Sequence, residues 1–359
     1  MSVSTTQSSP QILWLNAIII IGTPLVAVIW APFHIMRHGV HWSEPLAMVA
    51  LWWMTGLGIT IGYHRLWSHK AFQAKAPVRL VLAILGAASW QNTIIEWSSD
   101  HRRHHRHTDQ PDDPYNATRG FWWSHVGWIL IAGKYDGDLS NVHDLKDDPI
   151  CSWQHRNYLL ISTVFNVGIP VALGLATGRV LSMLLWAGLL RIIVAHHATF
   201  FINSLAHIWG SQPYSNATTA RDNPILAFFT LGEGYHNYHH TFQADYRNGV
   251  RWFQWDPSKW IIWTLSKIGL AFDLKRVPLD HRLKRRYQFI SRAMLSDVEE
   301  RLADADKRLQ ASFAEFRQKR LEAKQHASAI TRQARIELRG AQRSLERAFK
   351  EWLRATQVA

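Results

Sequence analysis

The residues of this chain that are best suited to chemistry are histidines gathered in three short blocks. The blocks are His64-Arg-Leu-Trp-Ser-His69, His101-Arg-Arg-His104-His105 and His236-Asn-Tyr-His239-His240. Imidazole is the commonest nitrogen ligand for iron, copper and zinc, and eight histidines fill most positions of a centre with two metal ions. Surface histidines placed at random would not cluster in this way. The blocks therefore predict a metal centre built from imidazoles.

The spacing inside the blocks predicts how helices present them. Residues i, i+3 and i+4 share one face of a helix, so His101, His104 and His105 can aim together at one centre, and so can the 236–240 block. Asn203 and His207, elsewhere in the chain, are one helical turn apart, so one can ligate directly while the other holds a water.

The first block has a different spacing. His64 and His69 are five residues apart, about 140° around an ideal helix. Both reach one metal only if the helix ends or bends between them.

The elements that must position these blocks include long apolar segments. Four stretches of about 20 residues suffice to cross a bilayer, and they lie near 12–32, 43–63, 157–177 and 180–202. Short turns join the first two and the last two, so each pair predicts a helical hairpin. Two hairpins return the chain to its starting side and place both termini and all three blocks on one face. That face carries most Lys and Arg, so we expect it to be cytoplasmic.

A fifth apolar stretch, 78–97, is not expected to cross. Its centre carries the amide and hydroxyl groups of Ser89, Gln91 and Asn92, which are costly in hydrocarbon. An embedded helix that lines a cavity fits better. Arg191 lies inside the fourth apolar stretch, and we expect it to reach the membrane surface or to contact an acidic group.

The charge of the chain is concentrated in its tail. The net charge is +13, and residues 281–359 hold 19 of the 40 Lys and Arg but 10 of the 27 Asp and Glu. Beside apolar spans, attraction to anionic lipid explains this charge better than nucleic acid binding, so we expect no nucleic acid partner. Apolar residues from Val298 to Phe316 in helical spacing predict one or two long helices, forming a basic amphipathic tail at the solvent or lipid surface.

Several cofactor classes are excluded by what the sequence lacks. Cys151 is the only cysteine, so no disulfide and no thiolate-bound cluster forms within the chain. Neither a His-Pro-Gly-Gly haem motif nor a glycine-rich dinucleotide fingerprint occurs, so no haem, flavin or NAD is expected. Residues 1–10 lack a basic start, and the apolar stretch that follows predicts an anchor rather than a signal peptide.

With these features in view, five segments closely resemble the membrane acyl-CoA desaturases, in particular the Δ9 or stearoyl-CoA type. They are Gly62-Tyr-His-Arg-Leu-Trp-Ser-His69, Asp100-His-Arg-Arg-His-His105, Arg119-Gly-Phe-Trp-Trp-Ser-His-Val-Gly-Trp128, Asn203-Ser-Leu-Ala-His207 and Gly232-Glu-Gly-Tyr-His-Asn-Tyr-His-His240. The resemblance covers residues 12–275. It implies an all-α integral membrane protein with four spans and a cytoplasmic helical cap, here residues 64–156 and 203–280, within a desaturase domain of residues 1–280 that the tail 281–359 follows.

The resemblance also implies the metals and the residues that bind them. The cofactor would be two irons, with O2 as co-substrate. The nine implied ligands are His64, His69, His101, His104, His105, His207, His236, His239 and His240, with Asn203 contacting one iron through water. Carboxylates should orient the rings and offset part of the iron charge, and the candidates are Glu96, Asp100 and Glu233.

The implied reaction removes two hydrogens from adjacent methylenes of a bound acyl chain and leaves a cis double bond. A methylene has no polar handle, so a narrow tunnel must select the carbon pair. In this family, residues matching Gln91, Trp97 and Thr199 would shape its bend, while Asn92 and Asp100 would contact the substrate head. Basic residues that bind CoA phosphates in vertebrate relatives correspond here to Ser99, Ala132 and Gly133, so acyl-lipid and acyl-carrier-protein esters stay open beside acyl-CoA.

Electrons must come from outside, from cytochrome b5 or from a ferredoxin with its reductase, in a bacterial inner membrane or the endoplasmic reticulum. The nearest alternative is a diiron membrane hydroxylase of alkanes or lipids. A metal transporter would carry ligands inside the spans, whereas these flank them. A scaffold built around the tail is a third alternative.

Overall fold

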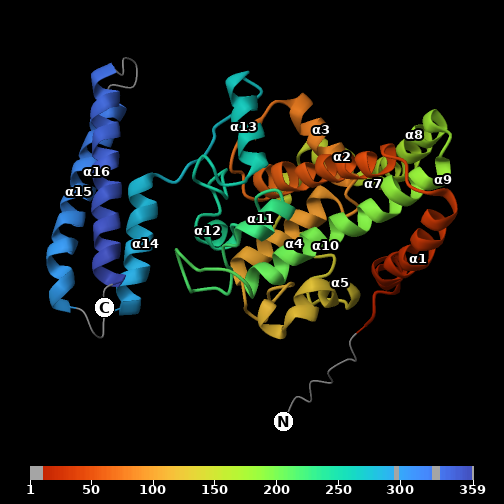
Figure 1. The fold of residues 1–359 in the computed structure, drawn as a ribbon, viewed down its shortest axis with the longest axis horizontal. Coiled ribbons are helices and arrows are strands. Elements are labelled where there is room, and N and C mark those ends of the chain that lie inside the picture. Colours follow the sequence, from red (N-terminus) through yellow and green to blue (C-terminus); the bar gives the residue numbers. More distant parts are fainter. Residues whose placement is uncertain (1–10, 295–298, 326–331, 358–359) are drawn as a thin grey trace, which may run out of the picture. The chain divides into compact units, whose positions relative to one another are not determined.

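A computed structural model describes residues 11–294, 299–325 and 332–357, and Figure 1 shows its helices. The chain separates into two compact units. The first, called the membrane unit, comprises the residues up to Ser211 and Thr218–Arg276. The second, called the tail unit, comprises Gln212–Ala217 and the described residues from Val277. Residues 1–10, on which the anchor prediction partly depends, lie outside the described residues.

Four helices of the membrane unit are long and apolar enough to cross a bilayer: Trp14–His38, Ser43–Ser68, Pro149–Thr177 and Val180–His207. They consist of α1 (Trp14–His38); α2 (Ser43–Leu57) with η1 (Gly58–Ser68); α7 (Pro149–Thr163), η4 (Val164–Gly168) and α8 (Ile169–Thr177); and α9 (Val180–Met183), η5 (Leu184–Leu190), α10 (Arg191–Asn203) and η6 (Leu205–His207).

Each of the four predicted apolar segments overlaps one of these helices, so the prediction of four long apolar helices is confirmed. The third helix begins eight residues earlier than the apolar segment does, because its first two turns are helical but polar.

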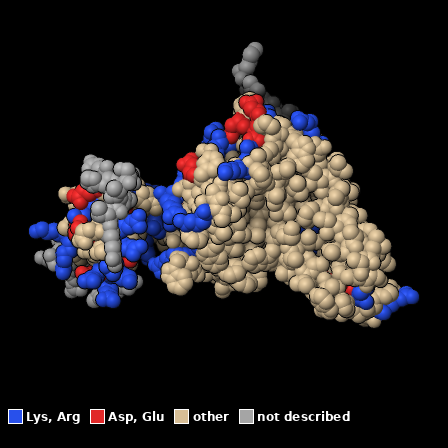
Figure 2. All heavy atoms as spheres, turned by 90° about the horizontal axis from the view of Figure 1, so that it is seen from above, with Lys and Arg blue, Asp and Glu red and all other residues tan. Residues whose placement is uncertain are grey.

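The outer surface of this bundle is apolar. On α1, Leu15, Ile18, Val28 and Ile29 are each more than three-fifths exposed. Figure 2 shows a broad belt of uncharged residues on the visible face of the membrane unit, with charged residues gathered toward its ends. Apolar surface of this extent is stable against lipid rather than water, which supports a multi-pass membrane protein.

The two hairpin turns lie beside each other. Arg179, in the turn between α8 and α9, donates from Nε to Oε1 of the buried Glu44 at 2.5 Å. The same guanidinium donates to the backbone carbonyls of His38, the last residue of α1, and of Gly39, at the start of the turn between α1 and α2. Because both turns occupy one end of the bundle, the polar segments that carry the histidines leave it at the other end.

The fifth apolar stretch forms only a short helix, α3 (Ala76–Ala87). Twelve residues extend about 18 Å, too short for a hydrocarbon core of about 30 Å. The turn that follows contains Trp90 and Asn92 with φ of 59° and 69°, a left-handed conformation that costs a bulky side chain about 1–2 kcal/mol. Neighbouring elements must therefore hold this turn in place.

Three side chains from other helices satisfy the carbonyls at the end of α3. The hydroxyl of Ser162 donates to the carbonyl of Ala87 at 2.9 Å. Nε2 of His196 lies 3.2 Å and 3.1 Å from the carbonyl oxygens of Ser89 and Trp90.

Arg191 is the third of these side chains. It is fully buried and donates to the carbonyls of Ala88 at 3.2 Å and Ala187 at 3.0 Å, and also to Oδ1 of Asn166. The expectation that Arg191 reaches the surface or an acidic group is therefore wrong. Carbonyls at a helix C-terminus carry partial negative charge, and together with an amide oxygen they replace a carboxylate.

The cap above the bundle is built from short helices and irregular loops. Its elements are α4 (Ile94–His107), η2 (Ala117–Arg119), η3 (Trp123–Gly127), α5 (Trp128–Leu130), α6 (His143–Lys146), α11 (Pro224–Phe229), α12 (His236–Thr241) and α13 (Pro257–Lys267). The strands β1 (Gln73–Ala74) and β2 (Ala271–Phe272) pair antiparallel, with Gln73 opposite Phe272. This pairing joins segments about 200 residues apart in the sequence.

The tail unit contains α14 (Leu279–Met294), α15 (Glu299–Gln325) and α16 (Arg332–Gln357). Its buried core is made by Leu309, Phe313, Phe316, Ala341, Leu345, Phe349 and Trp352, with Leu283 and Tyr287 of α14 packed against it. The prediction of one or two long helices agrees with α15 and α16. The described part of the tail also contains the shorter α14, and all three helices share a core that spacing along one helix does not reveal. Val298, part of that spacing, lies outside the described residues.

We predict that Arg191→Met lowers the free energy of unfolding of the membrane unit by about 1–3 kcal/mol, because it leaves the buried carbonyl of Ala88 without its donor. The midpoint of thermal unfolding in detergent measures the effect. Arg156→Met, at an exposed position of α7, is the control and should leave the midpoint unchanged. Equal midpoints for both variants would contradict the role given to Arg191.

Candidate metal centre and substrate cavity

All nine predicted histidines meet in the cap, in two groups. The first group is His64, His69, His101, His105 and His239, and the second is His104, His207, His236 and His240. Within each group the candidate ligand nitrogens lie within 4.8 Å of one another. They come from η1 and the residue after it, α4, η6 and α12.

Helices α4 and α12 divide their histidines between the two groups. Helix α4 gives its i,i+4 pair, His101 and His105, to the first group and His104 to the second. Helix α12 does the reverse, giving His236 and His240 to the second group and His239 to the first. The prediction that each triplet aims at one centre is therefore wrong: residues four apart share a group, whereas the residue three after the first diverges enough around the helix to reach the other group.

The first block reaches one group because its helix is wider than an α-helix. Residues Gly58–Ser68 form the π-helix η1, in which hydrogen bonds join residues five apart. The backbone N–H of His69 donates to the carbonyl of His64 at 3.0 Å. The bend that the five-residue spacing required is thus a π-helical turn that ends at the second histidine.

The start of helix α4 is fixed by its own sequence. Thr93 and Glu96 form a capping box at the start of α4, which satisfies two of the free N–H groups there. Glu96, proposed to orient a histidine, accepts from the N–H and the hydroxyl of Thr93. Glu96 therefore stabilises the first turn of α4, the helix that carries His101, His104 and His105.

The histidine rings meet through their Nε2 atoms. In the first group, Nε2 of His239 lies 2.9 Å from that of His64 and 2.9 Å from that of His105. In the second group, Nε2 of His236 lies 3.1 Å from that of His207 and 3.0 Å from that of His240.

These separations fit metal coordination. Nitrogens bound about 2.1 Å from one ion and 90° apart would lie about 3.0 Å from each other. The spacing of the donor atoms therefore suits one metal ion in each group.

The protonation of the rings favours the same conclusion. Burial lowers the pKa of His239 well below its ordinary value, and the neighbouring His64 and His69 lower it further. Burial also lowers the pKa of His101 and His236 well below the usual range. The rings of His101, His236 and His239 are therefore neutral at physiological pH, and a neutral ring whose Nδ1 holds the proton presents a lone pair at Nε2. Several lone pairs facing each other repel unless a cation lies between them.

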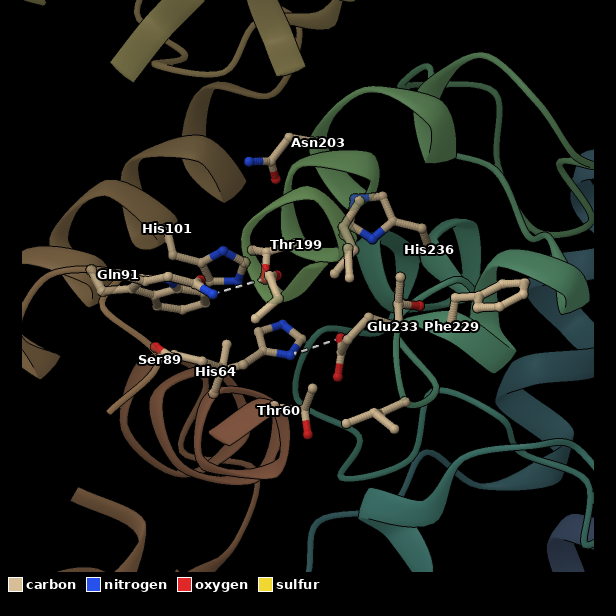
Figure 3. A pocket seen from close by; sticks show the side chains of 18 of the residues that line it. Thr60, His64, Ser89, Gln91, His101, Thr199, Asn203, Phe229, Glu233 and His236 are labelled. Atoms are coloured by element: carbon tan, nitrogen blue, oxygen red, sulfur yellow. Dashed lines mark hydrogen bonds and ion pairs between the residues drawn. The ribbon is translucent and has the colours of Figure 1, made fainter. Parts of the chain in front are cut away.

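Glu233 contacts a histidine, as predicted for an orienting carboxylate. Its Oε2 lies 2.9 Å from Nδ1 of His64, a contact drawn in Figure 3. Arg65 and Asn248 hold the carboxylate at 3.0 Å and 2.7 Å. Burial alone would raise the pKa of Glu233, but His64 and Arg65 outweigh it and lower the pKa, so the group stays ionised.

The polar groups that contact two other histidines were not predicted from the sequence. Oδ1 of the buried Asp113 lies 2.8 Å from Nδ1 of His104. The hydroxyl of Thr219 lies 2.7 Å from Nδ1 of His207, and Asp109 accepts from that hydroxyl at 2.8 Å. A possible signal was the run of aspartates just after the second histidine block. Asp113 lies nine residues after His104, too far to be read from helical spacing, and Asp109 reaches His207 only through Thr219, from a distant part of the sequence.

An apolar cavity adjoins the first and second groups. Its lining includes Trp52, Ile59, Ala195, Ile202 and Leu231, together with His64, His101, His104 and His236. Figure 3 shows His64, His101 and His236 pointing into the cavity from different elements. The histidine sites therefore border a space suited to hydrocarbon.

A larger cleft of about 910 Å³, called the outer cleft, adjoins this cavity, called the inner cavity. Both are lined by Gln91, Trp97, His101, Thr199 and Asn203. Gln91 donates to the hydroxyl of Thr199 at 3.0 Å, the dashed contact in Figure 3. Three residues predicted to shape a tunnel bend thus lie where the inner cavity meets the outer cleft.

The remaining predicted residues lie along the cleft or at the junction. Asn92 and Asp100 line the outer cleft. Burial raises the pKa of Asp100 to about 7, against the opposing effect of Arg103, whose Nη1 lies 3.7 Å away. Asn203, the last residue of α10, lies at the junction, one turn before His207.

The fold and the site together define a helical membrane protein with two adjoining histidine sites beside an apolar cavity. The profile of the fatty acid desaturase family matches residues 41–267. Among curated proteins, the chain is 43% identical over 267 residues to "Probable acyl-CoA desaturase" of Schizosaccharomyces pombe, covering 74% of this chain and 55% of that protein. It is 36% identical over 246 residues to human "Stearoyl-CoA desaturase 5", covering 65% of this chain and 74% of that protein.

A third relative is "Acyl-CoA Delta-9 desaturase" of Acheta domesticus, 36% identical over 276 residues, covering 75% of this chain and 76% of that protein. The matched part of the chain spans about half the length of the Schizosaccharomyces pombe protein and of "Acyl-CoA desaturase 1" of Saccharomyces cerevisiae. With the family profile covering more than half of its residues, this chain belongs to the fatty acid desaturase family.

We predict that each of two single substitutions, His239→Ala in the first group and His104→Ala in the second, abolishes turnover and lowers the amount of bound metal. His207→Ala should do the same. Metal analysis of the purified protein measures the loss directly. His143→Ala, at an exposed position of α6, is the control and should keep full metal content. Unchanged metal in His207→Ala would remove that residue from the second group.

We also predict that Asp113→Asn weakens metal binding by about 10–100-fold, the usual cost of losing a carboxylate that orients a metal ligand. Competition with a chelator of known affinity measures the change. Asp112→Asn is the matched control, because that neighbouring side chain is partly exposed and pairs with Lys134. Equal affinities in the two variants would show that Asp113 does not support the metal site.

Proposed function

We propose that this protein is an oxygen-dependent fatty acyl desaturase that introduces a cis double bond, at the Δ9 position, into a saturated acyl chain. The observation that carries the proposal is the pair of histidine groups bordering an apolar cavity. The nine histidines would hold two irons, and Asn203 would contact one of them through water. When bound, the irons supply, with O2, the oxidising power that removes two hydrogens from adjacent methylenes.

The protein itself would contribute position and dryness. Apolar side chains such as Trp52, Ile59 and Leu231 line the inner cavity and would hold the methylenes by exclusion of water. The hydrogen bond between Gln91 and Thr199, with Trp97 beside it, lies at the entrance. An acyl chain that passes this junction would have one carbon pair presented to the histidine groups, so regiochemistry would follow from geometry.

The names of the relatives and the residues that line the outer cleft indicate which group carries the acyl chain. The relatives are named as acyl-CoA desaturases, which supports a CoA thioester. The outer cleft contains Asn92 and Asp100, predicted to contact the head group, and the cations Arg103, Arg119 and Lys134. Lys134 pairs with Asp112 and Arg103 with Asp138, so acyl-lipid or acyl-carrier-protein esters stay the alternative.

We place the active site and both termini on the cytoplasmic side, in a bacterial inner membrane or the endoplasmic reticulum. Cytochrome b5 or a ferredoxin with its reductase would supply electrons. Residues 1–280 would carry out catalysis, with 281–359 as an appendage. A diiron hydroxylase uses similar histidine blocks but adds oxygen to the carbon, so the products distinguish the two reactions.

The test is the fatty-acid profile of a desaturase-deficient host that expresses this chain. Mass spectrometry should show loss of two hydrogens at one position of saturated chains, and the His104→Ala variant should show none. A chain without residues 285–359 should give the same products. Gain of one oxygen would favour hydroxylation, and an unchanged profile with normal expression and bound metal would contradict the proposal.

A further inference from the structure

Helix α16 of the tail unit carries a row of cations that its own fold does not use. We call this row the basic stripe: Arg335, Arg339, Arg343, Arg347, Lys350 and Arg354. Successive members are four, four, four, three and four residues apart, so they follow one face of the helix. All six are exposed. The stripe spans about 28 Å at 1.5 Å per residue.

The opposite face of α16 accounts for the stability of the unit. Ala341, Leu345, Phe349 and Trp352 are buried in the shared core with α14 and α15. The helix therefore has one face that packs and another that displays charge. Since the core is complete without the stripe, the stripe is free to serve a partner.

Neighbouring cations of the unit are used differently. Lys319 of α15 pairs with Glu337 at 3.0 Å and with Glu322 at 3.3 Å, and Arg320 pairs with Asp280 at 2.8 Å. In the described part of the chain, the six cations of the stripe form no ion pair. Like charges four residues apart repel and weaken a helix. An anionic partner would relieve that repulsion.

We propose that the basic stripe docks on anionic lipid headgroups of the membrane that holds the four long apolar helices. The same chain carries those helices, so the tail unit is tethered to a bilayer and meets its surface at high effective concentration. A row of Arg and Lys is attracted to an anionic leaflet. Ile336 is the one exposed large apolar residue on the described part of α16. Attraction rather than insertion would therefore drive the contact.

Charge in the rest of the unit is consistent with this assignment. Figure 2 shows Lys and Arg spread over the visible face of the tail unit, with fewer Asp and Glu among them. An acidic protein, such as an electron carrier, or a nucleic acid would need the same charge. Neither of these partners is brought near by the covalent structure, whereas the bilayer is.

The experiment uses the full chain in lipid nanodiscs. Cys151 is the only native cysteine and is fully buried, so Ile336→Cys gives one accessible thiol on the face of the stripe for a fluorophore. Quenching by a lipid with a spin-labelled headgroup then reports contact with the membrane. We expect severalfold stronger quenching when phosphatidylglycerol is added to phosphatidylcholine, and loss of the difference in molar salt.

Two variants with equal charge change separate the stripe from net charge. Arg339→Glu with Arg343→Glu should abolish the added quenching, while Lys307→Glu with Arg317→Glu, at exposed positions of α15, should keep most of it. Circular dichroism of each variant checks its folding, and the milder Arg339→Gln with Arg343→Gln should give an intermediate loss. Equal quenching in neutral and anionic membranes would overturn the proposal. So would a response that appears only when an acidic redox protein or a nucleic acid is added.

Discussion

The central constraint on this structure is that nine histidine side chains lie close together in two groups. Their facing nitrogens would repel one another unless metal ions lay between them. Burial lowers the pKa of His239 and keeps that ring neutral, and the Nε2 atoms of the rings approach one another within about 3 Å in two groups. No arrangement of hydrogen bonds satisfies several lone pairs that face one another. A metal ion accepts several such lone pairs at once, and the separations of the nitrogens fit its coordination. The carboxylates behind the rings, Glu233 and Asp113, add negative charge where two cations would need it.

The rest of the membrane unit brings four distant segments to that point and keeps a dry space beside it. The paired hairpin turns fix both hairpins at one end, joined by Arg179 and Glu44. The short helix α3 stops inside the bundle, where Arg191, His196 and Ser162 contact the carbonyls at its end and in the turn that follows. These contacts hold the strained turn after α3, from which Gln91 reaches Thr199. A buried arginine in a span thus serves the geometry of the cavity entrance.

Much of this was predictable from the sequence, and the failures have physical reasons. Apolar runs and histidine blocks are local patterns, so the four long helices and the gathering of the histidines could be expected from them. The division of each triplet between two groups was not predicted, because spacing along one helix does not say where a second site lies. Asp113 and Thr219 reach their histidines through loops, and loop paths leave no periodic signal.

The tail illustrates the same limit. Its basic and apolar residues predicted helices, but the shared core of α14, α15 and α16 comes from contacts between helices. Conversely, the residues of the basic stripe can be recognised in the sequence, because they are three or four residues apart. Only the exposure of its members, and the burial of the opposite face, distinguish a displayed surface from an ordinary charged helix.

The most direct test of the central claim is to locate the metals in the purified, active protein by anomalous X-ray scattering at the iron absorption edge. The account predicts two iron peaks, one enclosed by His64, His69, His101, His105 and His239, and the other by His104, His207, His236 and His240. A single peak, or peaks away from both groups in active protein, would contradict it.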